Sequence, residues 1–231
     1  MDMGIINRYK EISLFRKHFD IITNKIHYPI ANLLCAVIST SFITPNMVTL
    51  FAVLSELGAI WLIFVNLAEN KIIIILLLQL GWILDLMDGL LARYKKLGFY
   101  HPTNPSLKGY YWDAVSDHIL RLIVLTSLGI HLAQQEQYGF YYAFGGILIH
   151  AITQVEHIIR DYILKDIDDN QSVKGNNKKG VDMVILLFNN IYIFYFIFIL
   201  LNRIDLLFIV LPTIQLLLLI KRFFQFSFSD Y

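Results

Sequence analysis

The chain has 231 residues, of which 57% are hydrophobic and 16% are charged, and its formal net charge is +1. This composition excludes an ordinary soluble domain, and the near-neutral charge gives no reason to expect a nucleic-acid partner. It predicts an all-α integral membrane protein. The one cysteine, Cys35, excludes an intramolecular disulfide.

The N-terminal part of the chain is charged and amphipathic up to position 28, and an apolar piece follows over 29–42. We interpret residues 1–43 as interfacial amphipathic helices on the cytoplasmic side, with no signal peptide. A seventh span over 29–43 is the alternative, but it would be short and would end beside Pro45. Residues 44–231 then form the membrane domain.

Long apolar stretches fill that domain. A bilayer core of ~30 Å needs about 20 apolar helical residues to cross it. The sequence predicts six transmembrane helices, at roughly 47–68, 71–93, 110–133, 138–162, 181–201 and 204–222.

Basic residues are distributed unevenly among the segments that join these spans. Because cytoplasmic loops carry an excess of Lys and Arg, the distribution predicts that both termini and the loops after the second and fourth spans are cytoplasmic. In a bacterium the membrane would be the inner one. The opposite loops hold only Lys71 and Arg203, whereas the cytoplasmic segments hold Arg8, Lys10, Arg16, Lys17, Lys25, Lys95, Lys96, Lys108, Lys165, Lys174, Lys178, Lys179, Lys221 and Arg222.

Two groups of aspartates interrupt the second and third spans near their cytoplasmic ends. Asp85 and Asp88 are three residues apart, and Asp113 and Asp117 are four apart, so each pair lies on one helical face. A short loop joins the two spans, which makes them antiparallel neighbours and brings the four carboxylates together. Clustered carboxylates at this depth need neutralising, and oxygen ligands favour Mg²⁺ or Mn²⁺. Two such ions suit phosphoryl transfer.

The residues around these aspartates resemble the double signature of the CDP-alcohol phosphotransferase (CDP-alcohol phosphatidyltransferase) family. The family pattern is D-x-x-D-G-x-x-A-R followed by G-x-x-x-D-x-x-x-D, and Thr44 to Thr49 resembles a further P-N-x-x-T motif. The motifs cover residues 44–120. All eight fixed positions of the double signature are present, as Asp85, Asp88, Gly89, Ala92, Arg93, Gly109, Asp113 and Asp117.

The resemblance implies transfer of a substituted phosphate from a CDP-alcohol donor to a hydroxyl acceptor, with release of CMP, in phospholipid biosynthesis. CDP-diacylglycerol is the expected donor, and a homodimer is expected. Asp85, Asp88, Asp113 and Asp117 would hold two Mg²⁺ or Mn²⁺ ions, with Asp117 also the general base. The expected donor contacts are Asn46, Met47, Val48, Thr49, Gly89, Ala92, Arg93, Ser106 and Gly109.

One departure from the family pattern is the loop Tyr94–Lys108, which is longer than the family usually has. It reshapes the surroundings of the donor site and weakens the basis for assigning Ser106. The acceptor pocket is less defined: Arg121 and Arg160 are its candidates. Arg121 has either a phosphate or a metal-site aspartate as its partner, and Arg160 is also placed to pair with Glu156.

Three alternatives remain open. The donor is a CDP-linked small alcohol and the acceptor is a lipid; or the protein is a magnesium-dependent membrane prenyltransferase; or it is a divalent-ion transporter. Prenyltransferase motifs lack the D-G-x-x-A-R continuation, and a transporter would need acidic residues toward the outer leaflet as well. Turnover of isoprenyl diphosphates would indicate the prenyltransferase, and metal flux without CMP release would indicate the transporter.

Overall fold

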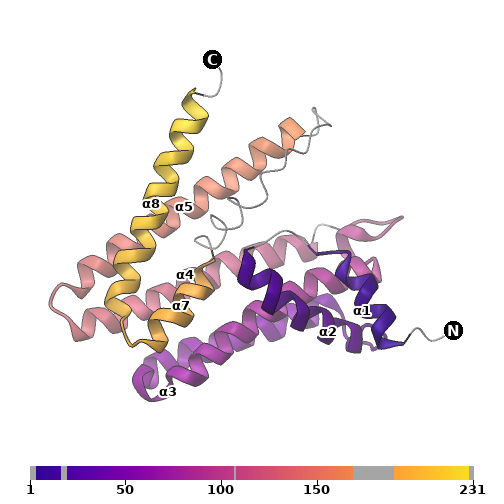
Figure 1. Cartoon of the computed structure of the whole chain (residues 1–231), viewed down its shortest axis with the longest axis horizontal. Helices are drawn as coiled ribbons and strands as arrows, with labels where there is room; N and C mark the ends of the chain where they lie inside the picture. Colours follow the sequence, from indigo (N-terminus) through magenta and orange to yellow (C-terminus); the bar gives the residue numbers. More distant parts are fainter. Residues whose placement is uncertain (1–3, 17–19, 107, 169–189, 229–231) are drawn as a thin grey trace. The chain divides into compact units, whose positions relative to one another are not determined.

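The computed structural model describes residues 4–16, 20–106, 108–168 and 190–228, and within these ranges the regular elements are all helices (Figure 1). The chain forms two compact units, Met1–Val124 and Leu125–Tyr231. The boundary between them falls inside helix α4 (Lys108–Gln135). An all-helical fold is therefore confirmed for the described residues.

The first unit begins with α1 (Ile5–Ser13), a π-helical turn η1 (Thr23–His27) and α2 (Tyr28–Ile38). These elements pack on one another and on α3 (Pro45–Lys95). Asp20 starts the π-helical turn, since its Oδ1 accepts hydrogen bonds from the backbone N–H groups of Ile22 and Thr23, both at 2.9 Å. Cys35 is fully buried in α2, and burial raises the pKa of its thiol to about 12, so it is a packing residue.

Helix α3 contains the first two predicted spans. Thr44 caps its start, where Oγ1 accepts a hydrogen bond from Met47 N at 3.4 Å. At Asn66 the backbone leaves the helical region (φ −169°, ψ 97°), and the chain reverses there. The two halves lie antiparallel, because Ser55 Oγ donates to the carbonyl oxygen of Leu77 at 2.8 Å. The first two predicted spans are thus the two halves of one long element.

Three stretches in the described residues are long and apolar enough to cross a membrane: Pro45–Tyr100, Val115–Gln135 and Ile204–Phe224. They make this a membrane protein, with two antiparallel halves in the first stretch. The fourth predicted span coincides with α5 (Gly139–Asp168). The fifth predicted span begins outside the described residues, and its described part forms the short helix α7 (Ile191–Leu200). Six spans and an interfacial N-terminus therefore stay predictions.

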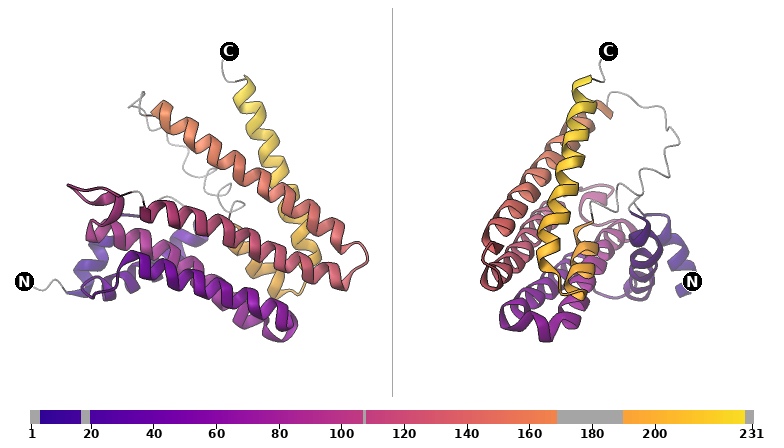
Figure 2. Two further views of the ribbon diagram at one scale, coloured as in Figure 1. Left: turned by 180° about the vertical axis from the view of Figure 1, so that it is seen from behind. Right: turned by 60° about the vertical axis from the view of Figure 1, so that its left-hand side comes forward.

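The second unit is built on the pairing of α5 with α8 (Ile204–Phe228), which run side by side, and α7 packs against α8 (Figure 2). A Cβ added at Gly146 would lie 2.8 Å from Phe208, so the glycine permits this close approach. Polar pairs also join the two helices. His150 contacts Gln215 at 2.9 Å, and Arg222 donates to Glu156 at 2.9 Å. Glu156 thus pairs with α8, whereas the side chain of Arg160, its other candidate partner, is outside the described residues.

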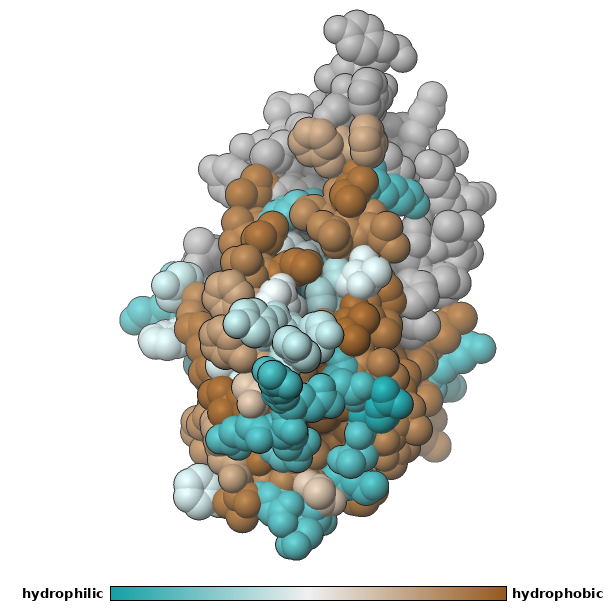
Figure 3. Space-filling model, turned by 90° about the vertical axis from the view of Figure 1, so that its left-hand side faces the viewer, coloured by the Kyte–Doolittle hydropathy of each residue, from teal (hydrophilic) through white to brown (hydrophobic). Residues whose placement is uncertain are grey.

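Large apolar side chains are exposed along the spans. Trp61, Phe64 and Leu76 on α3 are 69%, 57% and 62% exposed. On the face shown in Figure 3, hydrophobic surface is extensive and hydrophilic side chains gather in a limited band. This distribution is typical of helices whose outer faces contact lipid tails.

Candidate active site

Asp88 is the most constrained residue of the first aspartate group. Its side chain is 4% exposed, and Thr49 Oγ1 donates a hydrogen bond to its Oδ2 at 2.5 Å. Thr49 belongs to the first half of α3 and Asp88 to the second, so this bond joins the two predicted motifs across the helix pair. Asp85, one turn earlier, is partly buried on the same helix.

Next to Asp88 lies a cavity of about 450 Å³, which we call the polar pocket. Its walls come from the start of α3, the signature on the second half of α3, and the loop that follows. Six predicted donor contacts line it: Asn46, Thr49, Gly89, Ala92, Arg93 and Ser106. The remaining lining residues are Thr44, Pro45, Asp88, Leu97, Gly98, Phe99, Tyr100 and Lys108.

Other predicted donor contacts have different surroundings. Val48 is 2% exposed and belongs to the core of the first unit. Met47 supplies the backbone N–H that Thr44 caps, so its main chain helps to begin α3. Gly109 is on α4, but its surroundings are outside what the structure describes. Met47 and Val48 do not line the polar pocket, and their contact with the donor stays a prediction.

Arg93 is held from two sides at the rim of the polar pocket. Its Nε donates to the hydroxyl of Tyr100 at 3.1 Å, and its guanidinium carbon lies 5.4 Å from the centre of that ring. Its Nη1 donates to the carbonyl oxygen of Phe15 at 3.2 Å. These contacts fix a positive charge beside a pocket that also contains Lys108, and so favour an anionic ligand there.

The second aspartate group is on α4. Asp117 accepts a hydrogen bond from Arg121 Nη2 at 2.8 Å, and the Arg121 guanidinium carbon lies 5.7 Å from the Trp82 ring centre. Arg121 therefore pairs with a metal-site aspartate, one of its two expected partners. Asp113 lies on the same helix, and its side chain is outside the described residues. The convergence of all four carboxylates therefore stays a prediction.

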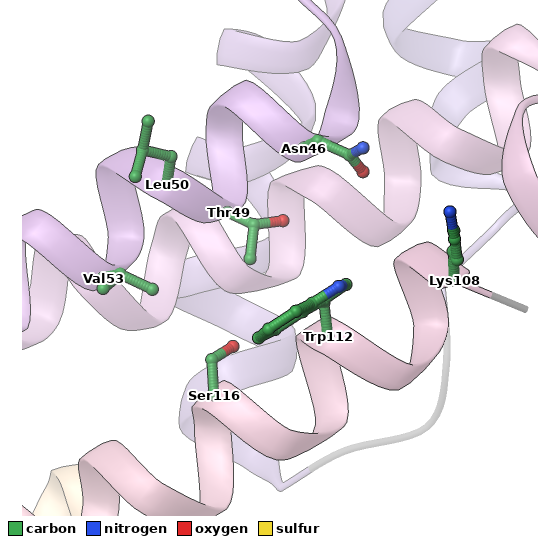
Figure 4. A pocket seen from close by; sticks show the side chains of 7 residues that line it. All are labelled: Asn46, Thr49, Leu50, Val53, Lys108, Trp112 and Ser116. Atoms are coloured by element: carbon green, nitrogen blue, oxygen red, sulfur yellow. The ribbon is translucent and has the colours of Figure 1, made fainter.

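A second cavity, of about 400 Å³, adjoins the polar pocket and shares Asn46, Thr49 and Lys108 with it. We call it the apolar groove. Figure 4 shows residues from the first half of α3 facing residues from the start of α4, with the Trp112 ring turned toward Thr49. The other lining residues are Leu50, Val53 and Ser116.

The polar pocket, the buried aspartate and the signature spacing point to one family. The family model described as CDP-alcohol phosphatidyltransferase matches residues 42–220. The chain belongs to the CDP-alcohol phosphatidyltransferase family. No curated protein matches the chain significantly. Membership makes the protein a membrane transferase of phospholipid synthesis that uses a CDP-alcohol donor and an alcohol acceptor.

Members of the CDP-alcohol phosphatidyltransferase family use a divalent metal. The donor chemistry here fits one, because Asp85, Asp88 and Asp117 offer only carboxylate oxygens, which hard cations prefer. Among the side chains that the structure describes, no three His, Cys, Asp or Glu lie together as a metal cluster. The predicted four-carboxylate centre includes Asp113, whose side chain is outside the described residues. The centre therefore stays a prediction.

Several residues that line the two cavities or support the site were not predicted from the sequence. Phe99 and Tyr100 come from the long loop, which the sequence marks only as a departure from the family pattern. Lys108 directly precedes the second signature, and Trp112 directly precedes Asp113; that adjacency was the available signal. Trp82, which stacks on Arg121, precedes Asp85 by three residues and so shares its helix face.

Proposed function

We propose that the protein transfers the phosphatidyl group of CDP-diacylglycerol to the hydroxyl of a small polar alcohol and releases CMP. The acceptor oxygen forms a bond to the phosphorus that carries the diacylglycerol. The bond from that phosphorus to the CMP oxygen breaks, and the electron pair leaves with CMP. The hydroxyl proton goes to Asp117, so charge and atoms balance.

The observation that carries this proposal is the continuity of the polar pocket with the apolar groove. A nucleotide diphosphate suits the pocket that contains Arg93 and Lys108, and an acyl chain suits the groove lined by Leu50, Val53 and Trp112. Because the two cavities share lining residues, one donor that has both parts fits them together. This supports a lipid-linked donor over a CDP-linked small alcohol.

Within the proposed site the aspartates divide the work. Asp85, Asp88, Asp113 and Asp117 would hold two Mg²⁺ or Mn²⁺ ions, which when bound neutralise charge on the diphosphate. Thr49 orients Asp88 by its hydrogen bond. Arg121 orients Asp117 and stacks on Trp82, which limits the rotamers open to the base.

Gly89 and Arg93 act on the donor side in this proposal. A Cβ added at Gly89 would lie 3.7 Å from the Arg93 guanidinium, at ordinary contact distance, and would stand in the wall of the polar pocket. Donor phosphate or ribose then approaches the helix backbone there. Arg93 supplies charge-assisted hydrogen bonds to the nucleotide. Arg121 and Arg160 are the proposed acceptor contacts, and Arg121 would reach the acceptor from beside the base.

The membrane arrangement proposed with this function is six spans with both termini and the active site in the cytoplasm, as a homodimer. The distribution of Lys and Arg supports the cytoplasmic side, the long apolar stretches support the six spans, and the homodimer is proposed from the family alone. The soluble donor head and the acceptor would then be supplied from the cytoplasm.

The direct experiment supplies purified protein with CDP-diacylglycerol, Mg²⁺ and a panel of small alcohols, and measures CMP release. A parallel series supplies CDP-linked small alcohols with diacylglycerol as acceptor. We expect CMP only in the first series, and loss of nearly all of it in Asp88→Asn. CMP release confined to the second series would reverse the assignment of donor and acceptor. No CMP in either series, with turnover of an isoprenyl diphosphate, would refute the proposed function.

A further inference from the structure

The long loop between the two signature motifs is a folded element. Lys96 ends α3 in the left-handed conformation (φ 53°), and Gly98 follows with φ 61°. The loop is closed at its base, because Ser106 N donates to the carbonyl oxygen of Gly98 at 3.0 Å. At its tip, the His101 ring accepts a hydrogen bond from Asn104 N at 3.0 Å. These bonds give the loop a defined shape.

That shape carries two aromatic rings to the polar pocket. A single turn of 3-10 helix, η2 (Gly98–Tyr100), places Phe99 and Tyr100 in the pocket wall. The two rings meet edge to face, with centres 5.5 Å apart and planes at 84°. They remain 51% and 40% exposed, so each retains a face that a ligand can cover.

The loop also contacts a residue of the family signature. Tyr100 receives the hydrogen bond of Arg93 Nε and lies under its guanidinium. Phe99 is beside this pair, and the described contacts of Arg93 go to Tyr100 and to Phe15. The two rings therefore line the same pocket as Arg93, Asn46 and Asp88.

We propose that Phe99 and Tyr100 form the surface on which the pyrimidine base of the donor packs, which makes the inserted loop a determinant of nucleotide binding. This inference rests on the proposed function, since it assumes a CDP-linked donor in the polar pocket. The polar pocket is the place for a base, because the acyl chains have the apolar groove. Aromatic rings bind nucleic-acid bases by stacking, and loss of one such contact weakens binding by about tenfold to a hundredfold.

The test compares two soluble ligands, CDP and ribose 5-diphosphate, which lacks the base. Equilibrium binding of each is measured to the full-length protein in detergent, for wild type, Phe99→Ala and Phe99→Trp. Phe42→Ala is the matched control, because Phe42 is 85% exposed and does not line the pocket. Phe99 is chosen over Tyr100 because its change leaves the Arg93 hydrogen bond in place.

We expect Phe99→Ala to weaken CDP binding about tenfold or more and to leave ribose 5-diphosphate binding within about twofold. Phe99→Trp restores CDP binding, and Phe42→Ala equals wild type. Equal weakening for both ligands overturns the inference, because it means general damage to the pocket. Unchanged CDP binding in Phe99→Ala also overturns the inference. If that variant loses activity only in a bilayer, the loop is a membrane anchor and not a base-binding surface. A wild type that binds neither ligand would refute the proposed function itself.

Discussion

At the scale of single residues, two glycines on α3 differ in the space around them. A Cβ at Gly81 would lie 2.8 Å from Glu56 Cγ, inside the packed contact of the two helix halves. A Cβ at Gly89 would be at ordinary contact distance from Arg93 and would project toward the polar pocket. Gly81 therefore serves helix packing, whereas Gly89 lines the polar pocket in which we propose that the donor binds.

This difference gives a paired prediction. Gly89→Ala should keep or slightly raise thermal stability, because glycine inside a helix costs about 0.5–1 kcal/mol relative to alanine, yet it should weaken CDP binding. Gly81→Ala should lower the melting temperature in detergent. Thermal unfolding and CDP binding, measured on both variants, check the pair. A Gly89→Ala protein that binds CDP as wild type does would show that the ligand does not approach this backbone.

Asp117 and Arg93 should fail in different ways. Asp117→Asn should retain CDP binding and lose turnover by about 10²–10⁴-fold, because the acceptor proton has no base. Arg93→Ala should instead raise the donor KM by roughly tenfold to a hundredfold, since a charge-assisted contact is lost. Binding and steady-state CMP release separate the two. If Asp117→Asn loses CDP binding as fully as Asp88→Asn, Asp117 is chiefly a metal ligand.

Some residue-level features followed from the sequence and others did not. The spacing of Asp85 and Asp88 predicted that they share a helix, and both lie on the second half of α3, with Asp88 in the wall of the polar pocket. The bond from Thr49 to Asp88 joins residues 39 positions apart, and no local pattern encodes such a contact. Phe99 and Tyr100 were missed for the same reason, because loop geometry decides where their rings lie.

At the scale of elements, the N-terminal segment is attached to α3 by a chain of polar contacts. Trp82 Nε1 donates to Thr23 Oγ1 at 3.4 Å, and His27 contacts Thr23 at 3.4 Å and Gln79 at 2.9 Å. Trp82 in turn lies under Arg121. The π-helical turn therefore supports the residue that orients Asp117.

His27 makes this attachment sensitive to pH. Burial lowers the pKa of His27 below its usual 6.5, an effect that the Gln79 hydrogen bond and Asp20 only partly offset. Below about pH 6.5 the unfolded chain binds a proton that the folded protein resists, so stability falls as the pH drops further. Above that pH both states are neutral and the contribution vanishes.

The corresponding measurement is the melting temperature in detergent between about pH 8 and about pH 5.5. Wild type should lose stability on acidification, by at most about 1.4 kcal/mol per pH unit from this one group. His27→Gln, which keeps a polar side chain and cannot titrate, should lose less. Identical pH profiles for the two proteins would contradict the assignment to His27.

The elements themselves were partly predictable. Apolar runs over 47–68 and 71–93 indicated two helices, and α3 holds both, with the reversal at Asn66, two residues before the predicted end of the first span. The fifth predicted span, 181–201, begins outside the described ranges and stays a prediction. The polar pairs between α5 and α8 were also missed, since Glu156 had a nearer candidate partner along its own helix.

At the scale of the whole molecule, the distribution of charge predicts which side of the membrane each loop occupies. Gln137 and Lys10 are both exposed and belong to regions predicted on opposite sides. In a Cys35→Ala background, Gln137→Cys should react with an impermeant thiol reagent added outside intact cells. Lys10→Cys should react only after the membrane is opened. The opposite labelling pattern would contradict the proposed orientation.

In the proposed reaction the protein transfers the phosphatidyl group of CDP-diacylglycerol to the hydroxyl of an alcohol. Its most direct test uses CDP-diacylglycerol with a radioactive label in the phosphate next to the diacylglycerol, and follows that label with and without the alcohol acceptor that gives most CMP. We expect the label to move into a phosphatidyl-alcohol lipid in amounts equal to the CMP released. The reaction should require both acceptor and Mg²⁺ or Mn²⁺, and Asp88→Asn should abolish it. Label recovered as phosphatidic acid whether or not acceptor is present would mean hydrolysis, and would contradict phosphatidyl transfer.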